Sequence, residues 1–154
     1  MHYANQAEKI LADLQAGKEA HTKEQQKNIF IRLNQLLGSV VKEQLFAVES
    51  EFTSVLNEVL ETVVVNGFAV DFTQELDPEI YYKFGEYLLN HFKDSPNQTE
   101  GIIYNYLDLF RHSGFLQQIY KQNHWPVLIQ QLVEASNYTV QKNCRILCCQ
   151  SIWS

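Results

Sequence analysis

Apolar residues recur along much of this chain at intervals of three and four, the spacing that gathers side chains on one face of an α-helix. The strongest series spans residues 52 to 64 and has seven members: Phe52, Val55, Leu56, Val59, Leu60, Val63 and Val64. No stretch alternates convincingly between apolar and polar residues, as a half-buried strand would. The pattern therefore predicts an all-α fold. The Asn-Gly pair at residues 66–67 leaves a β-hairpin over residues 63–68 as the local alternative.

Capping residues and glycines predict where these helices begin and end. Thr22 with Gln25 fits a capping box, Asp77 before a proline fits a helix start, and Thr99 is a candidate cap for the next helix. Residues 95–97 are then a loop. A glycine follows many helices because it adopts a left-handed conformation without steric cost. We therefore expect four glycines at or just after helix ends: Gly17, Gly38, Gly67 and Gly114.

Similar apolar positions return along the chain at a nearly constant interval. Two sets of residues are spaced by 43 and then 44 positions: Leu45, Leu88 and Leu132, and Leu60, Ile103 and Leu147. Stacked helical repeats produce such spacing, because each unit places the same positions in the core. We expect all six residues to be core. The predicted organisation is one domain over residues 1–154, with capping helices at 1–38 and units at 39–66, 67–113 and 114–154. A non-repeating helical bundle is the alternative.

The last third of the chain, residues 113–154, carries a family resemblance. Residues 125–132 (WPVLIQQL) and 136–144 (SNYTVQKNC) resemble an armadillo repeat, and residues 40–66 fit a HEAT-type repeat about as well. The resemblance implies an armadillo/HEAT-like α-solenoid, a right-handed superhelix of stacked helices. It also implies a non-enzymatic scaffold or adaptor that binds a protein or peptide along the surface lined by the last helix of each repeat. A compact helical regulator that binds and modulates one enzyme is the alternative function.

Members of that family that clamp peptides carry a Trp and, four residues later, an Asn in this last helix. Ile146 and Gln150 occupy those positions here, which argues against a basic nuclear-import peptide as the ligand. The last helix stays apolar to its final turn, so Ile152 and Trp153 are expected to meet another surface. That surface would be a further repeat, a second copy or a separate partner, with packing onto the chain's own core as the alternative. If it is a second copy, Trp153→Glu should abolish self-association.

Composition narrows the classes of partner. The chain has 154 residues, 45% of them apolar, and a formal net charge of −6. Nucleic acids and anionic membrane surfaces attract basic proteins, so neither is an expected partner. No apolar run is long enough for membrane insertion, and the N-terminus lacks the apolar core of a secretory signal. The three cysteines do not form a disulfide framework, so we expect a reducing, cytoplasmic location.

No motif points to catalysis, a metal or a cofactor. The five histidines lack the spacing of a helical metal site, and neither a phosphate-binding loop nor a nucleophile elbow is present. We therefore predict that the protein is not an enzyme and uses no cofactor. Cys144 and Cys148 share a helix face and suit close helix packing, and Cys149 follows directly. Lipidation or redox sensing at these cysteines is the less favoured alternative.

Candidate partner-binding residues come from the aromatic helices and the end of the chain. Aromatic side chains crowd residues 81–92 and 104–115 on more than one helix face, so some should remain at the surface. The candidates are Tyr82, Tyr104, Ile146, Gln150, Ile152 and Trp153. An acidic edge precedes the first aromatic helix and comprises Asp71, Glu75, Asp77 and Glu79. We interpret it first as a solvated, well-capped loop, and second as a docking site for a basic partner.

Overall fold

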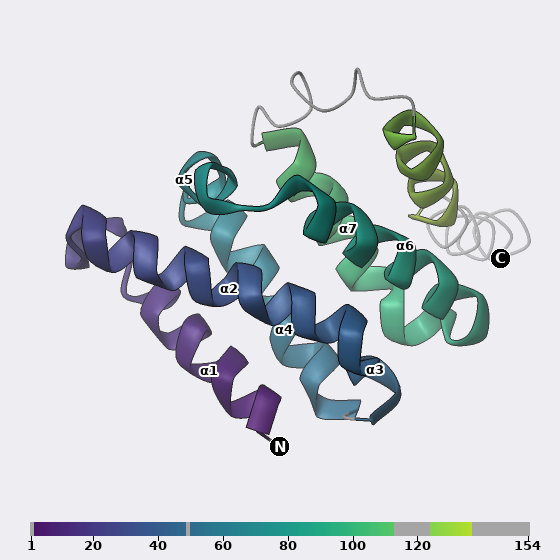
Figure 1. The fold of residues 1–154 in the computed structure, drawn as a ribbon, viewed down its shortest axis with the longest axis horizontal. Coiled ribbons are helices and arrows are strands. Elements are labelled where there is room, and N and C mark those ends of the chain that lie inside the picture. Colours follow the sequence, from purple (N-terminus) through teal and green to yellow (C-terminus); the bar gives the residue numbers. More distant parts are fainter. Residues whose placement is uncertain (1, 49, 113–123, 137–154) are drawn as a thin grey trace, which may run out of the picture.

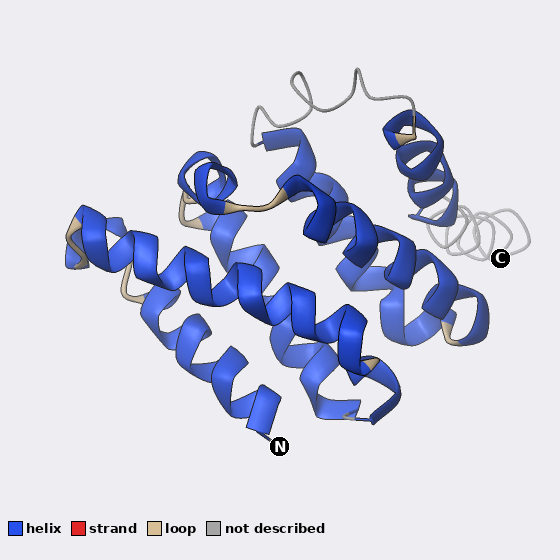
Figure 2. Cartoon of the chain, in the orientation of Figure 1, coloured by secondary structure: helices blue, strands red, loops and turns tan. Residues whose placement is uncertain are grey.

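A computed structural model describes residues 2–48, 50–112 and 124–136 of the chain, and within them every regular element is a helix (Figures 1 and 2). The elements are α1 (His2–Gln15), the 3-10 helix η1 (Lys18–Ala20), α2 (Lys23–Glu43), α3 (Leu45–Val48), α4 (Ser50–Val65), α5 (Ala69–Glu75), α6 (Pro78–Asp94), α7 (Pro96–His112) and a further helix at 125–136. The all-α prediction is confirmed. The hairpin alternative is wrong, because α4 continues through Val65.

The helices pack in two layers. In the first layer α4 lies between α1 and α7, and in the second layer α2 lies beside α6 (Figure 1). Contacts of α1 with α2 and of α6 with α7 join the two layers. The short helix α5 packs against α2, and the helix at 125–136 packs against α6. Successive long helices therefore alternate between the layers along the chain.

Two helix starts form as the sequence predicts. The Thr22 hydroxyl accepts a hydrogen bond from the Gln25 amide at 3.1 Å, and the Thr22 amide donates to the Gln25 side chain at 2.9 Å. This is a complete capping box, which satisfies backbone N–H groups that an α-helix leaves without partners. At α6 the Asp77 carboxylate accepts from the Glu79 amide at 2.9 Å, and Pro78 is the first helical residue.

Gly67 ends α4 in a Schellman motif. Its φ of 77° is left-handed, the Phe68 amide donates to the Val63 carbonyl at 2.9 Å, and the Gly67 amide donates to the Val64 carbonyl at 3.1 Å. This turn directs Phe68 back into the core, where it is fully buried. Gly17 follows α1 with a φ of 85°. The predictions for these two glycines are confirmed.

Two predicted boundaries are wrong. Gly38 does not end a helix, because α2 continues through it to Glu43 and ends at Gln44, whose φ is 53°. The predicted division after residue 38 thus falls inside α2. Thr99 does not cap α7, which begins at Pro96. Proline suits the first helical position because its missing N–H would have no partner there. Thr99 is buried one turn later, and its hydroxyl donates to the Ser95 carbonyl at 3.0 Å.

The acidic edge is not a loop throughout. Residues 69–75 form α5, and Phe72 of this helix is fully buried against Phe30, with ring centroids 5.9 Å apart. A helix of this length is too short to establish an apolar period. Contact with α2 stabilises it instead.

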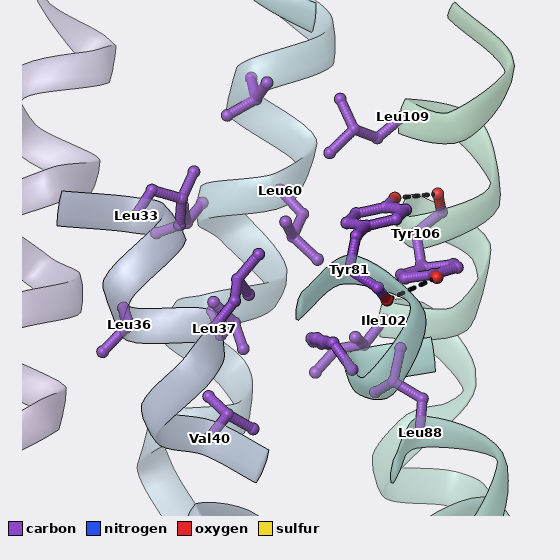
Figure 3. Close-up of a cluster of buried hydrophobic side chains, with 14 of the residues drawn as sticks. Leu33, Leu36, Leu37, Val40, Leu60, Tyr81, Leu88, Ile102, Tyr106 and Leu109 are labelled. Atoms are coloured by element: carbon purple, nitrogen blue, oxygen red, sulfur yellow. Dashed lines mark hydrogen bonds between the residues drawn. The ribbon is translucent and has the colours of Figure 1, made fainter. Parts of the chain in front are cut away.

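The predicted core positions are confirmed wherever the structure describes them. Leu60, Leu88, Ile103 and Leu132 have no exposed surface, and Leu45 is 2% exposed (Figure 3 labels Leu60 and Leu88). Leu147 lies outside the described residues. So do Gly114, Cys144, Cys148 and Cys149, and the C-terminal interface candidates Ile146, Gln150, Ile152 and Trp153.

Candidate interaction face

A buried pair of tyrosines joins α6 to α7. The Tyr81 hydroxyl donates to the Tyr106 carbonyl at 2.6 Å, and the Tyr106 hydroxyl donates to the Tyr81 carbonyl at 2.7 Å (Figure 3). The two rings are stacked, with centroids 4.1 Å apart and planes 8° apart. Each buried hydroxyl therefore has an acceptor, which removes most of the cost of burying it. The pair fixes the register of the two helices.

Trp125 attaches the helix at 125–136 to this pair. Its side chain is 1% exposed and lies against Phe110, with centroids 5.4 Å apart, and against Tyr82, at 5.0 Å and 76°. The absence of a side chain at Gly85 allows a close approach, because a Cβ there would lie 3.0 Å from Leu128 Cδ2. α6 is thus covered on one side by residues 124–136 and on the other by α2.

Two grooves flank the exposed ridge of α6. The α2–α6 groove, of about 330 Å³, is lined by residues that include Val41, Gln44, Tyr87, Asn90, His91 and Asp94. The Trp125 groove, of about 440 Å³, is lined by residues that include Asp77, Pro78, Glu79, Tyr82, His124 and Trp125. Lys83 and Glu86 line both grooves. We refer to the two grooves and the ridge between them as the α6 face.

The α6 face is acidic. Its lining residues carry four carboxylates and one ammonium group, a formal charge of −3 with histidines neutral: Asp77, Glu79, Glu86, Asp94 and Lys83. Lys83 Nζ lies 3.6 Å from a carboxylate oxygen of Glu79, in an exposed pair. Burial and the neighbouring charge of Glu86 raise the pKa of Tyr82. The face therefore favours cationic groups and disfavours anionic ones.

The two described candidates for partner binding, Tyr82 and Tyr104, lie in different parts of the fold. Tyr82 lines the Trp125 groove, where its ring also meets His124 edge to face with centroids 4.6 Å apart. Tyr104 is 57% exposed on α7, in the other layer, and lines neither groove.

The four residues of the acidic edge also line two different grooves. Asp77 and Glu79 belong to the α6 face. Asp71 and Glu75 instead line a different groove, next to α2, and a carboxylate oxygen of Asp71 lies 2.7 Å from Lys18 Nζ.

Glu86 was not predicted as a site residue, although the sequence contains a signal for it. Glu79, Lys83, Glu86 and Asn90 follow each other at intervals of four, three and four, so a polar stripe runs along α6. His124 and Trp125 had no such signal as site residues, because only tertiary packing brings them beside this stripe.

The tyrosine pair predicts a loss of stability at high pH. Burial raises the pKa of Tyr81 and Tyr106 well above the ordinary value. A pKa raised in the folded state stabilises the fold fully below the unfolded value of about 10, and that contribution is lost as the pH rises through the folded pKa. We expect the free energy of unfolding to fall above about pH 10 by up to about 1.4 kcal/mol per pH unit for each tyrosine.

Urea denaturation at successive pH values, with tyrosinate absorbance as a second signal, measures this effect. The two buried tyrosines should ionise only as the protein unfolds. Ionisation of all eight tyrosines near pH 10 in a protein that stays folded would contradict the expectation.

Comparisons with protein-family models, with curated proteins and with solved structures found no match. Within the described ranges, no helix combines the length and apolar character needed to span a bilayer. The same residues contain no group of three or more His, Cys, Asp or Glu side chains that could hold a metal ion.

Proposed function

We propose that this protein is a non-enzymatic scaffold that binds a segment of another protein along the α6 face. The observation that carries the proposal is the pair of grooves that share Lys83 and Glu86 on one exposed helix. An extended or helical segment that crosses the ridge would contact both grooves at once. Tyr82 offers part of an aromatic ring there, a residue type enriched where protein interfaces bind tightly.

The charge of the face specifies the chemistry of the partner. Glu86 makes no ion pair with any described residue, and it lines both grooves. An arginine or lysine of the partner would pair with Glu86 and lie beside the Tyr82 ring, where cation–π attraction adds to the ion pair. We therefore propose a partner segment that carries positive charge.

We further propose that the fold is an armadillo/HEAT-like arrangement in a cytoplasmic protein. The long helices alternate between two layers in the order α1, α2, α4, α6 and α7. This order supports the armadillo/HEAT-like arrangement, because stacked helix pairs produce it. Solution scattering tests it against the helical bundle. We expect a radius of gyration clearly above the roughly 15 Å of a compact chain of this length. A value near 15 Å would favour the bundle.

Selection of a random peptide library on the purified protein tests the binding function. We expect the selected peptides to be rich in Arg or Lys and to lose about tenfold or more in affinity on Glu86→Lys, because the substitution replaces attraction with repulsion at the ridge. Glu58→Lys is the matched control, since Glu58 is exposed on α4 in the other layer. Peptides that bind wild type and Glu86→Lys equally would place the interaction elsewhere and contradict the proposal.

A further inference from the structure

Another groove in the described part of the chain lies away from the α6 face. It runs between α1 and α2 and has a volume of about 500 Å³, within the range of small-molecule sites. Its apolar lining comprises the half-buried Tyr3 and two core residues, Ile10 and Leu36, each of which is only 2% exposed. Polar side chains from both helices line the rest, and they include Gln6, Gln35 and Ser39. We refer to it as the α1–α2 groove.

The charges of this groove are opposite in sign to those of the α6 face. Lys9 and Arg32 line it, and no carboxylate does, in a chain whose formal net charge is −6. Lys9 is exposed, and its ammonium group makes no hydrogen bond or ion pair with a described residue. A local excess of positive charge on an acidic protein favours an anionic ligand at this place.

Arg32 is held in position by two contacts that leave most of its donors available. Its Nη2 lies 2.6 Å from a carboxylate oxygen of Asp13, and its Nε donates to the Asn28 side chain at 3.0 Å. A guanidinium group has five N–H donors, so three remain for a ligand. Since Asp13 and Asn28 already order the side chain, a ligand would not have to immobilise it, and that cost of binding is reduced.

We infer that the α1–α2 groove binds a small organic acid with an apolar body. The carboxylate would accept hydrogen bonds from Arg32 and pair with Lys9, and the apolar part would lie against Tyr3, with Ile10 and Leu36 beneath it. A cation would be repelled by Lys9, and a neutral apolar molecule would leave the donors without a new acceptor. This inference does not depend on the proposed function of the α6 face.

The test is an NMR titration of the whole chain with a panel of aromatic and medium-chain monocarboxylates, each paired with its neutral amide. We expect at least one carboxylate to cause saturable shifts at Lys9, Arg32 and Leu36, with its amide binding about tenfold more weakly or worse, because a hydrogen bond to a charged group is lost.

Lys9→Gln should weaken binding several-fold without changing the fold, since Lys9 makes no contact that the fold needs. Arg32→Gln should weaken it further. Lys93→Gln removes the same charge from an exposed position at the end of α6 and should have no effect.

Three results would overturn the inference. The first is that no carboxylate in the panel gives saturable shifts at the α1–α2 groove. The second is equal binding of acid and amide, or equal binding to wild type and Lys9→Gln, which would mean that the charge is not recognised. The third is tighter binding of a blocked glutamate-containing peptide than of every free acid, which would assign the groove to a protein partner. None of these results bears on the peptide selection at the α6 face.

Discussion

Leu88→Ala is expected to lower the free energy of unfolding by about 2–5 kcal/mol. Leu88 has no exposed surface and lies on α6 (Figure 3). This helix contacts α2, α7 and residues 124–136. Truncation removes buried methyl groups and leaves a cavity that the surrounding helices fill only in part. Urea denaturation monitored by circular dichroism measures the change.

A matched pair in another helix provides the control for this prediction. Leu132 is fully buried and Val127 is 59% exposed, and both lie in the helix at 125–136. Leu132→Ala should cost about as much as Leu88→Ala, whereas Val127→Ala should change stability by no more than about 0.5 kcal/mol. A cost below about 0.5 kcal/mol for Leu88→Ala would place that residue at the surface.

Gly85→Ala is expected to destabilise the protein by about 1–3 kcal/mol, the usual cost of overpacking a core. A Cβ at residue 85 would lie 2.5 Å from the Tyr106 hydroxyl oxygen and 2.8 Å from its Cζ. Tyr106 cannot move away freely, because its ring is stacked on Tyr81 and its hydroxyl bonds to the Tyr81 carbonyl. Relief of the clash would disrupt the bonds that join α6 to α7.

Gly38→Ala is the control that isolates this clash. Gly38 also lies inside a helix, but a Cβ there would have only an ordinary contact, 3.8 Å from Ile80 Cδ1. Alanine restricts the unfolded chain more than glycine, so Gly38→Ala should stabilise the protein by about 0.5–1 kcal/mol. Thermal unfolding of the two variants should therefore shift in opposite directions. An increase in Tm for Gly85→Ala would mean that the Tyr106 ring adjusts at little cost.

The sequence alone determined the features of this fold that depend on neighbours a few residues apart. The apolar series from Phe52 to Val64 predicted α4, because a helix brings residues three and four apart together. Thr22 and Asp77 predicted helix starts because their side chains bind amides two or three residues along the chain. Leu60 and Leu88 were predicted as core from the recurrence of similar positions every 43 or 44 residues, which is also visible in the sequence alone.

The tertiary structure decided the candidate site. The acidic character of Asp77 and Glu79 was visible in the sequence, but their place in one groove with His124 and Trp125 was not. That groove exists because Trp125 packs on the aromatic side chains of α6 and α7, more than 40 residues away from the acidic pair along the chain. Contacts at such separation leave no period or cap in the sequence.

The two helical glycines illustrate the same division. From the sequence, Gly38 was predicted to end a helix, and Gly85 carried no signal at all. The structure places both inside helices, Gly38 with room for a methyl group and Gly85 with a tyrosine ring in that space. Glycine has the same helix propensity at both positions. Only the Tyr106 ring of α7 therefore makes Gly85 costly to replace by alanine, whereas Gly38 is replaceable.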